Sequence, residues 1–467
     1  MGRKMCRVLE NMYEKVESAV VTGEGLTEWF KLSRGVKQGG KVSPWLYALF
    51  INGVVKMVKE MGGGVEIVGV RGEKIWMGCW LYADDIVLVG GSVEEVQRMV
   101  KVVEEYARKW RFKMSAIKSK VLYFGRKLVG DIVMDGKVLE VVKCFRYLGI
   151  ELEEWNRWKA MAEKVVKKAK ETHGWLVGRL ASDKWRYSVS LKKRVWEACV
   201  RPLLEYGVEV WEPGRSMAEK IERLMGKGGR MILGVGKCTA GVVVKGELGW
   251  VSMEARRGVI LMRFVGKLER MQEERVIGEL YQVGKIGWVK GSRKGSKWWA
   301  RVERVSKEWG LKEIWESGVV KGMRKNEWEK LVEKRMMRME KLKWRRELER
   351  MGSREGSKVA LYWKLKDKWG MEEYLKGGRS RGSVAWKTKL RSGTCELEVE
   401  MGRGVVAREE RVCKLCGRGV EDVRHFVWEC LALDKVRGWW WLELGKELGK
   451  HREGGAAWGM LGKWKEE

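Results

Sequence analysis

The stretch that most constrains the fold of this chain is residues 80–89, where apolar residues lead into Asp84 and Asp85 and apolar residues follow them. A short apolar run on each side of a polar pair is typical of a β-hairpin that carries the pair at its turn. We therefore expect a buried hairpin. Two adjacent buried carboxylates need a positive partner, and Mg²⁺ binds one or two carboxylates together with phosphate oxygens. The alternative is a solvated turn that carries two aspartates and binds no metal.

Four segments occur in a fixed order around this stretch: residues 34–52, 80–89, 115–121 and 145–150. The first is a glycine-rich loop followed by a helix-like run, and the second contains Tyr-Ala-Asp-Asp. In order and spacing the four resemble polymerase motifs B, C, D and E of the reverse transcriptases of LINE-type (non-LTR) retrotransposons. The resemblance implies an α+β fold: a palm of antiparallel sheet and helices at residues 1–150, then a helical thumb at 151–275.

The resemblance also implies an activity, RNA-directed DNA polymerisation. A primer 3′-OH would attack the α-phosphate of a dNTP, with Mg²⁺ (or Mn²⁺) held by Asp84 and Asp85. Tyr82 would position the incoming nucleotide, and Lys118 would protonate the pyrophosphate leaving group. The alternative for Lys118 is a solvated side chain in a loop.

The glycine-rich loop is the second implied binding element, because glycine lets the backbone approach a ligand closely. By resemblance, four of its residues would line the nucleotide and template side of the palm: Arg34, Gly35, Gln38 and Gly39. The family usually has Cys-Pro where this chain has Gly40-Lys41, which makes the loop less rigid. A loop that only caps the following helix is the alternative.

One family motif has no counterpart in this sequence. Motif A supplies a further metal-binding Asp from a strand beside the hairpin, and it precedes the helix expected here at residues 3–22. Asp84 is the first Asp of the chain. Two-metal catalysis requires ions about 3.5–4 Å apart, bridged by carboxylates from separate strands. We therefore expect a truncated palm, without motif A or fingers, and a polymerase of weak or no activity.

Composition favours a polyanionic partner, since Lys and Arg outnumber Asp and Glu by enough to give a formal charge of +33. The expected partners are an RNA template, a DNA primer or target, and dNTPs. The chain also holds 59 Gly and 28 Trp but 3 Pro. Residues with G- and A-rich codons are thus in excess, and a biased base composition is an alternative source of the charge.

The remainder of the chain reads as helical. Amphipathic helices are expected near residues 159–176, 190–211 (bent at Pro202) and 217–233, with basic faces that would follow a nucleic-acid backbone or merely be solvated. Residues 276–385 would form a basic helical connector that contains a linker at 285–300. Trp298 and Trp299 in this linker could stack on bases, but we favour a place in the core. A helical tail would occupy residues 436–467.

A second strong pattern lies at Cys413, Cys416, His425 and Cys430, spaced Cys-x2-Cys-x8-His-x4-Cys. Two thiolates from a short turn and a His/Cys pair complete a closed tetrahedral Zn²⁺ site. We expect structural zinc, with a helix over residues 422–428 that presents His425, in an element spanning residues 386–435. LINE-type proteins carry a similar element near the C-terminus, which would bind RNA or target DNA. Free buried thiols with an unrelated histidine are the alternative.

Three functional interpretations remain after this reading. The leading one is the C-terminal portion of a LINE-type reverse transcriptase. The alternatives are a non-catalytic RNA- or DNA-binding protein or retroelement remnant, and a group II intron maturase, which the long helical region disfavours. No apolar run of about 18 residues and no signal-peptide core is found, so we expect an intracellular protein in nuclear or cytoplasmic ribonucleoprotein, with no membrane partner. The sequence does not predict an oligomeric state.

Overall fold

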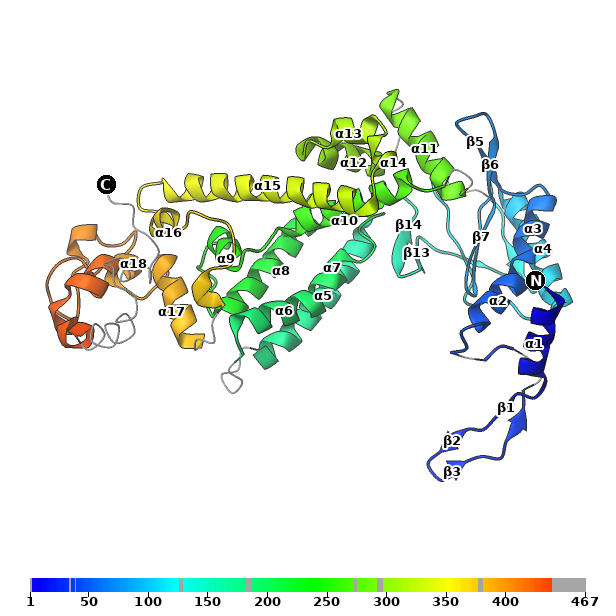
Figure 1. Cartoon of the computed structure of the whole chain (residues 1–467), viewed down its shortest axis with the longest axis horizontal. Coiled ribbons are helices and arrows are strands. Elements are labelled where there is room, and N and C mark those ends of the chain that lie inside the picture. The colour runs from blue at the N-terminus through cyan, green and yellow to red at the C-terminus, as the bar shows by residue number, and fades with distance from the viewer. Residues whose placement is uncertain are drawn as a thin grey trace. The chain divides into compact units, whose positions relative to one another are not determined.

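The computed structural model describes residues 2–32, 35–37, 39–125, 129–155, 157–180, 187–272, 275–291, 297–376 and 381–438. The chain divides into two compact units. The N-terminal unit comprises Met1–Phe145 and Glu153–Trp155, and the C-terminal unit comprises Arg146–Leu152 and Asn156–Glu467. Figure 1 shows strands and short helices in the first, and mainly helices in the second.

The N-terminal unit contains four helices: α1 (Arg3–Glu14), α2 (Ser43–Ile51), α3 (Gly53–Glu60) and α4 (Val93–Lys109). Its strands are β1 (Glu17–Ser18), β2 (Val21–Thr22), β3 (Gly25–Leu26), β4 (Phe30–Lys31), β5 (Val65–Val68), β6 (Lys74–Met77), β7 (Cys79–Tyr82), β8 (Asp85–Leu88), β9 (Lys120–Val121), β10 (Val133–Met134), β11 (Lys137–Val138) and β12 (Glu140–Val141). The boundary between the two units falls within the hairpin of β13 (Cys144–Tyr147) and β14 (Ile150–Glu153).

The predicted antiparallel palm sheet occurs only as separate two-stranded pairs among the described residues. The strands hold two to four residues each, too few to build a broad sheet. One pair, β9 with β12, is parallel, whereas β5–β6 and β7–β8 are antiparallel hairpins. The mixed α and β class is therefore confirmed, and the palm arrangement stays a prediction.

Helices α3 and α4 form the core of the N-terminal unit against the β7–β8 hairpin. Its buried members come from α2, α3, α4 and β7: Ile51, Val54, Val58, Cys79, Met99, Val103 and Tyr106. Ser92 caps the N-terminus of α4, because its hydroxyl accepts a hydrogen bond from Glu95 N at 3.1 Å. Each buried aliphatic side chain contributes about 1.5–3 kcal/mol, so this core fixes the hairpin on the helices.

Helix α1 is shorter than predicted. It ends at Glu14, not near residue 22, because Glu17–Ser18 and Val21–Thr22 pair as strands with β4 and β3. None of its residues is buried within this unit.

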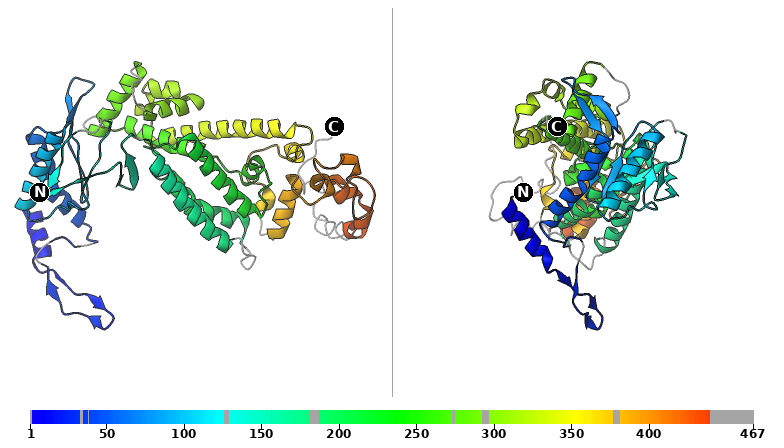
Figure 2. Two further views of the ribbon diagram at one scale, coloured as in Figure 1. Left: turned by 180° about the vertical axis from the view of Figure 1, so that it is seen from behind. Right: turned by 90° about the vertical axis from the view of Figure 1, so that its right-hand side faces the viewer.

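The C-terminal unit is built from helices, shown from two further directions in Figure 2. They are α5 (Lys159–Leu180), α6 (Val189–Cys199), α7 (Arg201–Glu205), α8 (Arg215–Leu233), α9 (Gly241–Leu248), α10 (Met253–Glu269), α11 (Val276–Val289), α12 (Lys297–Glu308), α13 (Lys312–Glu316), α14 (Val319–Gly322), α15 (Lys325–Gly352), α16 (Ala360–Leu365), α17 (Arg381–Arg391) and α18 (Glu398–Met401). Short helical turns lie at Glu373–Leu375, Arg408–Glu410, His425–Glu429 and Leu431–Leu433.

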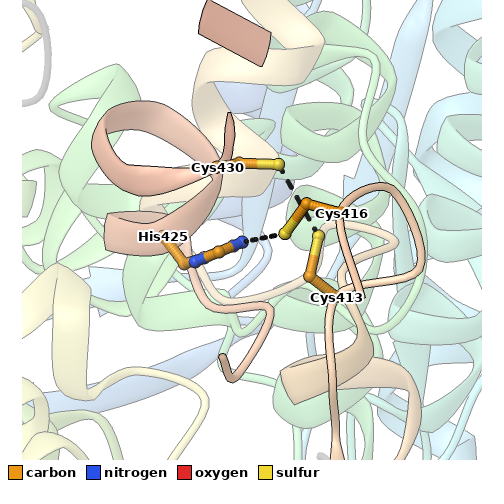
Figure 3. A group of neighbouring side chains, drawn as sticks. All are labelled: Cys413, Cys416, His425 and Cys430. Atoms are coloured by element: carbon orange, nitrogen blue, oxygen red, sulfur yellow. Dashed lines mark hydrogen bonds between the residues drawn. The ribbon is translucent and has the colours of Figure 1, made fainter. Parts of the chain in front are cut away.

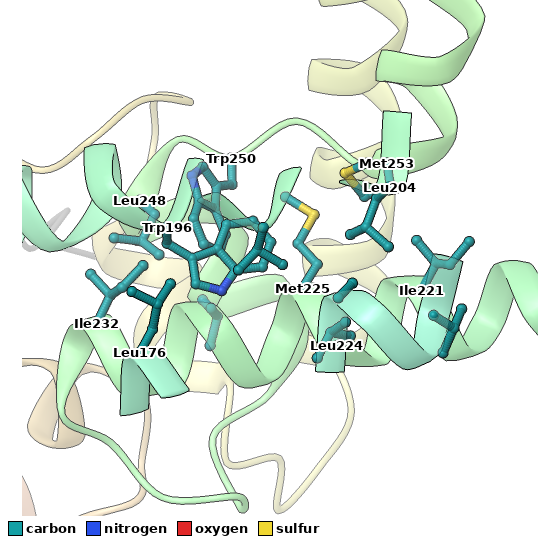
Figure 4. Close-up of a cluster of buried hydrophobic side chains, with 14 of the residues drawn as sticks. Leu176, Trp196, Leu204, Ile221, Leu224, Met225, Ile232, Leu248, Trp250 and Met253 are labelled. Carbon is teal, nitrogen blue, oxygen red and sulfur yellow. The ribbon is translucent and has the colours of Figure 1, made fainter. Parts of the chain in front are cut away.

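The three helices predicted between residues 159 and 233 are present. The middle one is interrupted as expected, since α6 ends at Cys199 and α7 starts with Pro202 in its first turn. Figure 4 shows their shared core, in which Trp196 of α6 lies among side chains from α5, α7 and α8. The Trp196 and Trp250 rings are 4.9 Å apart.

A second core joins α10, α12 and α15. Trp298 and Trp299 pack against it, and Trp298 Nε1 donates a hydrogen bond to Glu209 O at 2.6 Å, so the core reading of these residues is confirmed. The predicted linker at 285–300 was partly wrong. Residues 285–289 belong to α11 because buried Lys285 pairs with Glu269 at 2.7 Å, and α12 starts at Lys297. Residues 292–296 lie outside the described parts.

Tryptophan rings repeatedly cover glycines of a neighbouring helix. A β-carbon on Gly266 of α10 would collide with the Trp328 ring of α15, and one on Gly258 would lie 2.6 Å from the Trp309 ring. Trp328 Nε1 also donates to Met262 O at 2.7 Å. The Trp328 ring is thus held both by contact and by a hydrogen bond. Within the described parts, no helix is both long and apolar enough to span a membrane.

Candidate active site and metal centre

The β7–β8 hairpin places Asp84 and Asp85 at its tip. Tyr82 pairs with Asp85 across the strands, which leaves Ala83 and Asp84 as the two-residue turn. Ala83 has φ 50°, the left-handed conformation that tight hairpin turns require. The hairpin and the position of both aspartates are therefore as predicted.

Burial of the tip was wrong. Asp84 and Asp85 are exposed, and the ring of Tyr82 is 62 % exposed. The buried part of the hairpin is its base, where Cys79 lies in the core and Leu81 and Ile86 pack against it. The apolar flanks predicted burial correctly for the base, but the turn projects beyond the side chains that cover it. Because both carboxylates are exposed, no cation is needed to offset the cost of burying them. Both remain accessible to a metal ion.

Tyr47 of α2 was missed in the sequence interpretation. It packs against the same core as Leu81 and Ile86 of the hairpin. Its pKa is raised, first by burial and then by the negative charge of Asp84. The signal in the sequence was weak, because Tyr47 looks like one more apolar residue of a core helix.

The glycine-rich loop is described only in part. Arg34 and Gln38 lie outside the described residues, while Gly35 and Gly39 have φ 88° and 79°. Both glycines thus adopt backbone conformations that other residues rarely reach. Ser43 Oγ, at the start of α2, donates to Lys37 O at 2.6 Å and ties the loop to the helix. This contact is consistent with a loop that caps α2. It does not test whether the loop also lines a nucleotide and template site.

Lys118 lies in an exposed turn closed by a hydrogen bond from its own N to Ser115 O at 3.1 Å. Its side chain is solvated, which both readings of this residue allow. Among the described residues, Asp84 and Asp85 do not join a third ligand-type side chain to make a metal-binding group. Two carboxylates on one turn do not supply the pair of bridged ions that two-metal catalysis uses.

The four predicted zinc ligands do come together. Figure 3 shows Cys413, Cys416, His425 and Cys430 around one centre, and their ligand atoms all lie within 4.8 Å of one another. Cys413 Sγ and Cys430 Sγ are 3.8 Å apart, and Cys416 Sγ lies 3.3 Å from His425 Nε2. Two sulfurs bound to one Zn²⁺ at tetrahedral angles would be about 3.8 Å apart. The donor set and its spacing thus fit a closed tetrahedral site.

The local backbone explains how these ligands converge. Val412 and Val420 form a β-bridge, and Cys413 N donates to Gly419 O at 3.0 Å, which folds the first two cysteines into a tight turn. The predicted helix at 422–428 is present over residues 423–429. Residues 425–429 form a π-helical turn closed by Cys430 N and His425 O at 2.8 Å. The hydrogen bond between residues i and i+5 of a π-helical turn matches the five-residue separation of the two ligands His425 and Cys430.

Two acidic residues beside the cluster were missed. Asp422 Oδ1 accepts a hydrogen bond from His425 N at 2.9 Å, and Glu421 Oε1 lies 3.7 Å from Cys413 Sγ. The sequence offered a signal for Asp422, since an acidic residue three positions before a helical residue often caps it. Burial raises the pKa of Cys413 to about 11. Desolvation also acts on Cys416, but hydrogen bonds with the Arg418 backbone and with the other ligands lower its pKa to about 7.

The family model for reverse transcriptase (RNA-dependent DNA polymerase) matches residues 3–152 of this chain. The match begins with α1, includes the loop, α2 and the β7–β8 hairpin, and ends within β14. This part of the chain is similar to the reverse transcriptase family, and the aspartate-tipped hairpin lies inside the matched segment.

Proposed function

We propose that the chain is the C-terminal portion of a LINE-type reverse transcriptase, an RNA-directed DNA polymerase that extends a primer 3′-OH with dNTPs. The observation that carries the proposal is the exposed Asp84–Asp85 hairpin tip within the segment that matches the reverse transcriptase family. In this proposal residues 1–150 are a truncated palm, 151–275 a thumb, 276–385 a connector, 386–435 the zinc element and 436–467 a tail.

The residues of the tip would act by binding and orienting substrates. Asp84 and Asp85 would hold Mg²⁺ or Mn²⁺, which supplies charge stabilisation to phosphoryl transfer when bound. The exposed ring of Tyr82 would position the nucleotide, and Lys118 would donate a proton to the leaving pyrophosphate. Arg34, Gly35, Gln38 and Gly39 would contact nucleotide and template.

We further propose that this chain alone extends primers weakly or not at all. Two carboxylates on one turn, without a third ligand group beside them among the described residues, support this reading. The same observation favours a second candidate, a non-catalytic RNA- or DNA-binding protein or retroelement remnant. The group II intron maturase reading stays less favoured, because a long helical region precedes the Cys-Cys-His-Cys element.

The zinc element has a supporting role in the proposal. Structural Zn²⁺ on the three cysteines and His425 would hold the fold of a small module that contacts RNA or DNA. The solvated basic side chains of the helical unit would add phosphate contacts that do not depend on sequence. The protein would act within intracellular ribonucleoprotein.

The test is primer extension on an RNA template with Mg²⁺ or Mn²⁺, by wild type and by the double variant Asp84→Asn/Asp85→Asn. Asp131→Asn, which changes an exposed aspartate of the same unit, is the matched control. Because both tip aspartates are exposed, the double variant should melt at the wild-type temperature, so any loss reports on chemistry.

The outcomes separate the candidates. Extension by wild type and Asp131→Asn, lost in the double variant, supports a polymerase at this tip. Extension that survives the double variant contradicts the assignment of the site. Salt-sensitive RNA and DNA binding by both proteins without extension favours the binding protein.

A further inference from the structure

Helix α15 (Lys325–Gly352), the long helix of Figure 1, turns one row of side chains toward the interior of the C-terminal unit. Its buried residues recur at every fourth position: Trp328, Val332, Met336, Glu340, Trp344, Leu348 and Gly352. Side chains two positions apart on a helix lie about 200° apart around its axis. The row that begins at Lys330 and also recurs at every fourth position therefore lies on the opposite side of α15.

That opposite row, which we call the basic ridge, consists of cations at every position except one. Its members are all exposed: Lys330, Lys334, Arg338, Leu342, Arg346 and Arg350. The rows on either side contain acids as well, among them Glu329 and Glu333 on one side and Glu347 on the other. A biased base composition would enrich every row in Lys and Arg alike. The exclusion of acids from the row that faces solvent therefore favours a negatively charged partner.

The cations of the basic ridge have no acidic partner within the described parts of the chain. Glu333, in the neighbouring row, pairs with Arg263 of α10. Glu347 and Glu349 are exposed near the end of the ridge, and neither forms an ion pair with it among the residues described. Like charges four residues apart on a helix repel one another. A polyanion bound along the ridge would offset this repulsion.

Hydrogen bonds on the buried side of α15 fix the direction in which the ridge faces. Trp328 Nε1 donates to Met262 O at 2.7 Å, and Trp344 Nε1 donates to Val242 O at 2.9 Å. The two bonds lie on the same buried row and hold the helix against rotation about its axis. The ridge therefore presents its cations from a fixed backbone, which lowers the cost of ordering them when a ligand binds.

We propose that the basic ridge binds the sugar–phosphate backbone of double-helical nucleic acid. At 1.5 Å per residue, the ridge from Lys330 to Arg350 is about 30 Å long, close to one turn of a duplex at about 34 Å. Lys and Arg contact phosphates irrespective of base sequence. A single strand fits less well, because the ridge has no aromatic side chain on which unpaired bases could stack.

An acidic polypeptide is the other class of polyanion that a row of cations could bind. A duplex carries one negative charge per about 1.7 Å of its axis, whereas an extended polypeptide has at most one per residue of about 3.3–3.6 Å. The duplex is therefore the denser partner. The inference rests on the nucleic-acid binding of the proposed function, and it names the surface and the form of nucleic acid. It does not depend on Asp84 or Asp85.

The test measures binding of the full chain to a short DNA duplex of mixed sequence, by fluorescence anisotropy over a range of salt concentrations. Lys330→Gln/Lys334→Gln/Arg338→Gln should bind about tenfold more weakly than wild type or worse, and its salt slope should be shallower by about 3, because each phosphate contact contributes about one. Lys330→Arg/Lys334→Arg/Arg338→Lys keeps the charges and should bind as wild type does. The glutamine variant should melt no lower than wild type, because repulsion along the ridge is relieved.

The matched control is Lys101→Gln/Arg108→Gln/Lys109→Gln, which removes the same charge from exposed positions of α4. It should keep the affinity and the salt slope of wild type. Unchanged duplex binding by the glutamine variant of the ridge, an equal loss in the control, or equal affinity for single-stranded DNA would each overturn the inference. Displacement of the duplex by polyglutamate at equal charge concentration would also overturn it and indicate an acidic protein.

Primer extension, measured on the same proteins, separates this inference from the proposed function. If the glutamine variant of the ridge loses duplex binding while wild type extends no primer, the inference holds and the polymerase proposal fails. If wild type extends primers and the ridge variant binds the duplex unchanged, only the inference fails. If wild type neither binds the duplex nor extends primers, both fail.

Discussion

Arg391 and Glu247, 144 residues apart in the chain, form a buried ion pair in which Arg391 Nε donates to Glu247 Oε1 at 3.0 Å. Their side chains are 1 % and 0 % exposed. The Tyr374 hydroxyl donates to the other carboxylate oxygen of Glu247 at 2.5 Å. The pair links α9 to α17, the helix that precedes the cysteine cluster. It therefore holds the start of the zinc element on the helical unit.

Breaking this pair should be costly. Arg391→Met leaves the Glu247 carboxylate buried without its cation, and we expect a loss of about 3–5 kcal/mol in the free energy of unfolding by urea. Arg391→Met combined with Glu247→Gln should lose less than Arg391→Met alone, because no buried charge remains. Lys325→Met, which removes a surface partner 4.0 Å from Glu329, should leave the midpoint nearly unchanged. Equal losses in the single and double variants would show that the charges are not coupled.

Zinc removal should unfold the cysteine element locally. We expect about one zinc per chain by elemental analysis of the wild type. Cys430→Ser changes a fully buried ligand and should abolish zinc binding, whereas Cys199→Ser changes an exposed cysteine and should retain it. A chelator should then make residues 394–438 of wild type sensitive to protease, as in Cys430→Ser. A metal-free wild type that resists protease throughout would favour the reading of free buried thiols.

Acid should destabilise the helical unit through His173. Burial, followed by the charge of Lys227, lowers the pKa of His173, whose Nδ1 accepts a hydrogen bond from Trp196 Nε1 at 3.4 Å. The unfolded chain therefore binds a proton more readily, and stability falls as the pH drops through about 6.5 and below. Thermal melting between pH 8 and 5.5 should show this fall in wild type and a smaller one in His173→Gln. Identical pH profiles would exclude His173 as the source.

The close approach of α10 and α15 can be tested at Gly266. Gly266→Ala would drive a methyl group into the Trp328 ring, and we expect a loss of about 1–3 kcal/mol. Gly287→Ala is the matched control, since a β-carbon at this position of α11 meets nothing within 4 Å. Its higher helix propensity should stabilise by about 1 kcal/mol. Chemical denaturation of both variants measures the difference, and a stable Gly266→Ala would show that the helices can move apart.

Local patterns predicted the local structures well. The Tyr-Ala-Asp-Asp turn marked the β7–β8 hairpin, and Pro202 marked the break between α6 and α7. Each depends on neighbours within a few residues, which is the range over which capping, alternation and proline act.

Features that depend on distant residues escaped the sequence reading. Exposure of Asp84 depends on what covers the hairpin, and the apolar flanks reveal only that its base is covered. The π-helical turn at His425 reflects closure of the four ligands, not helix propensity. The Glu247–Arg391 pair arises from helices brought together by folding. Arg34 and Gln38 stay predictions.

The tryptophan rings that lie over glycines give the chain's many tryptophans and glycines a role in packing. At Gly266 and Trp328, or Gly258 and Trp309, the largest and the smallest residue together fill the volume that two medium-sized residues would fill elsewhere. Replacing only the glycine would cause a steric clash, and replacing only the tryptophan would leave a cavity. The two residues of each pair should therefore be inherited together. A gene that gains both residue types together can thereby drift far in composition and still keep its interior filled.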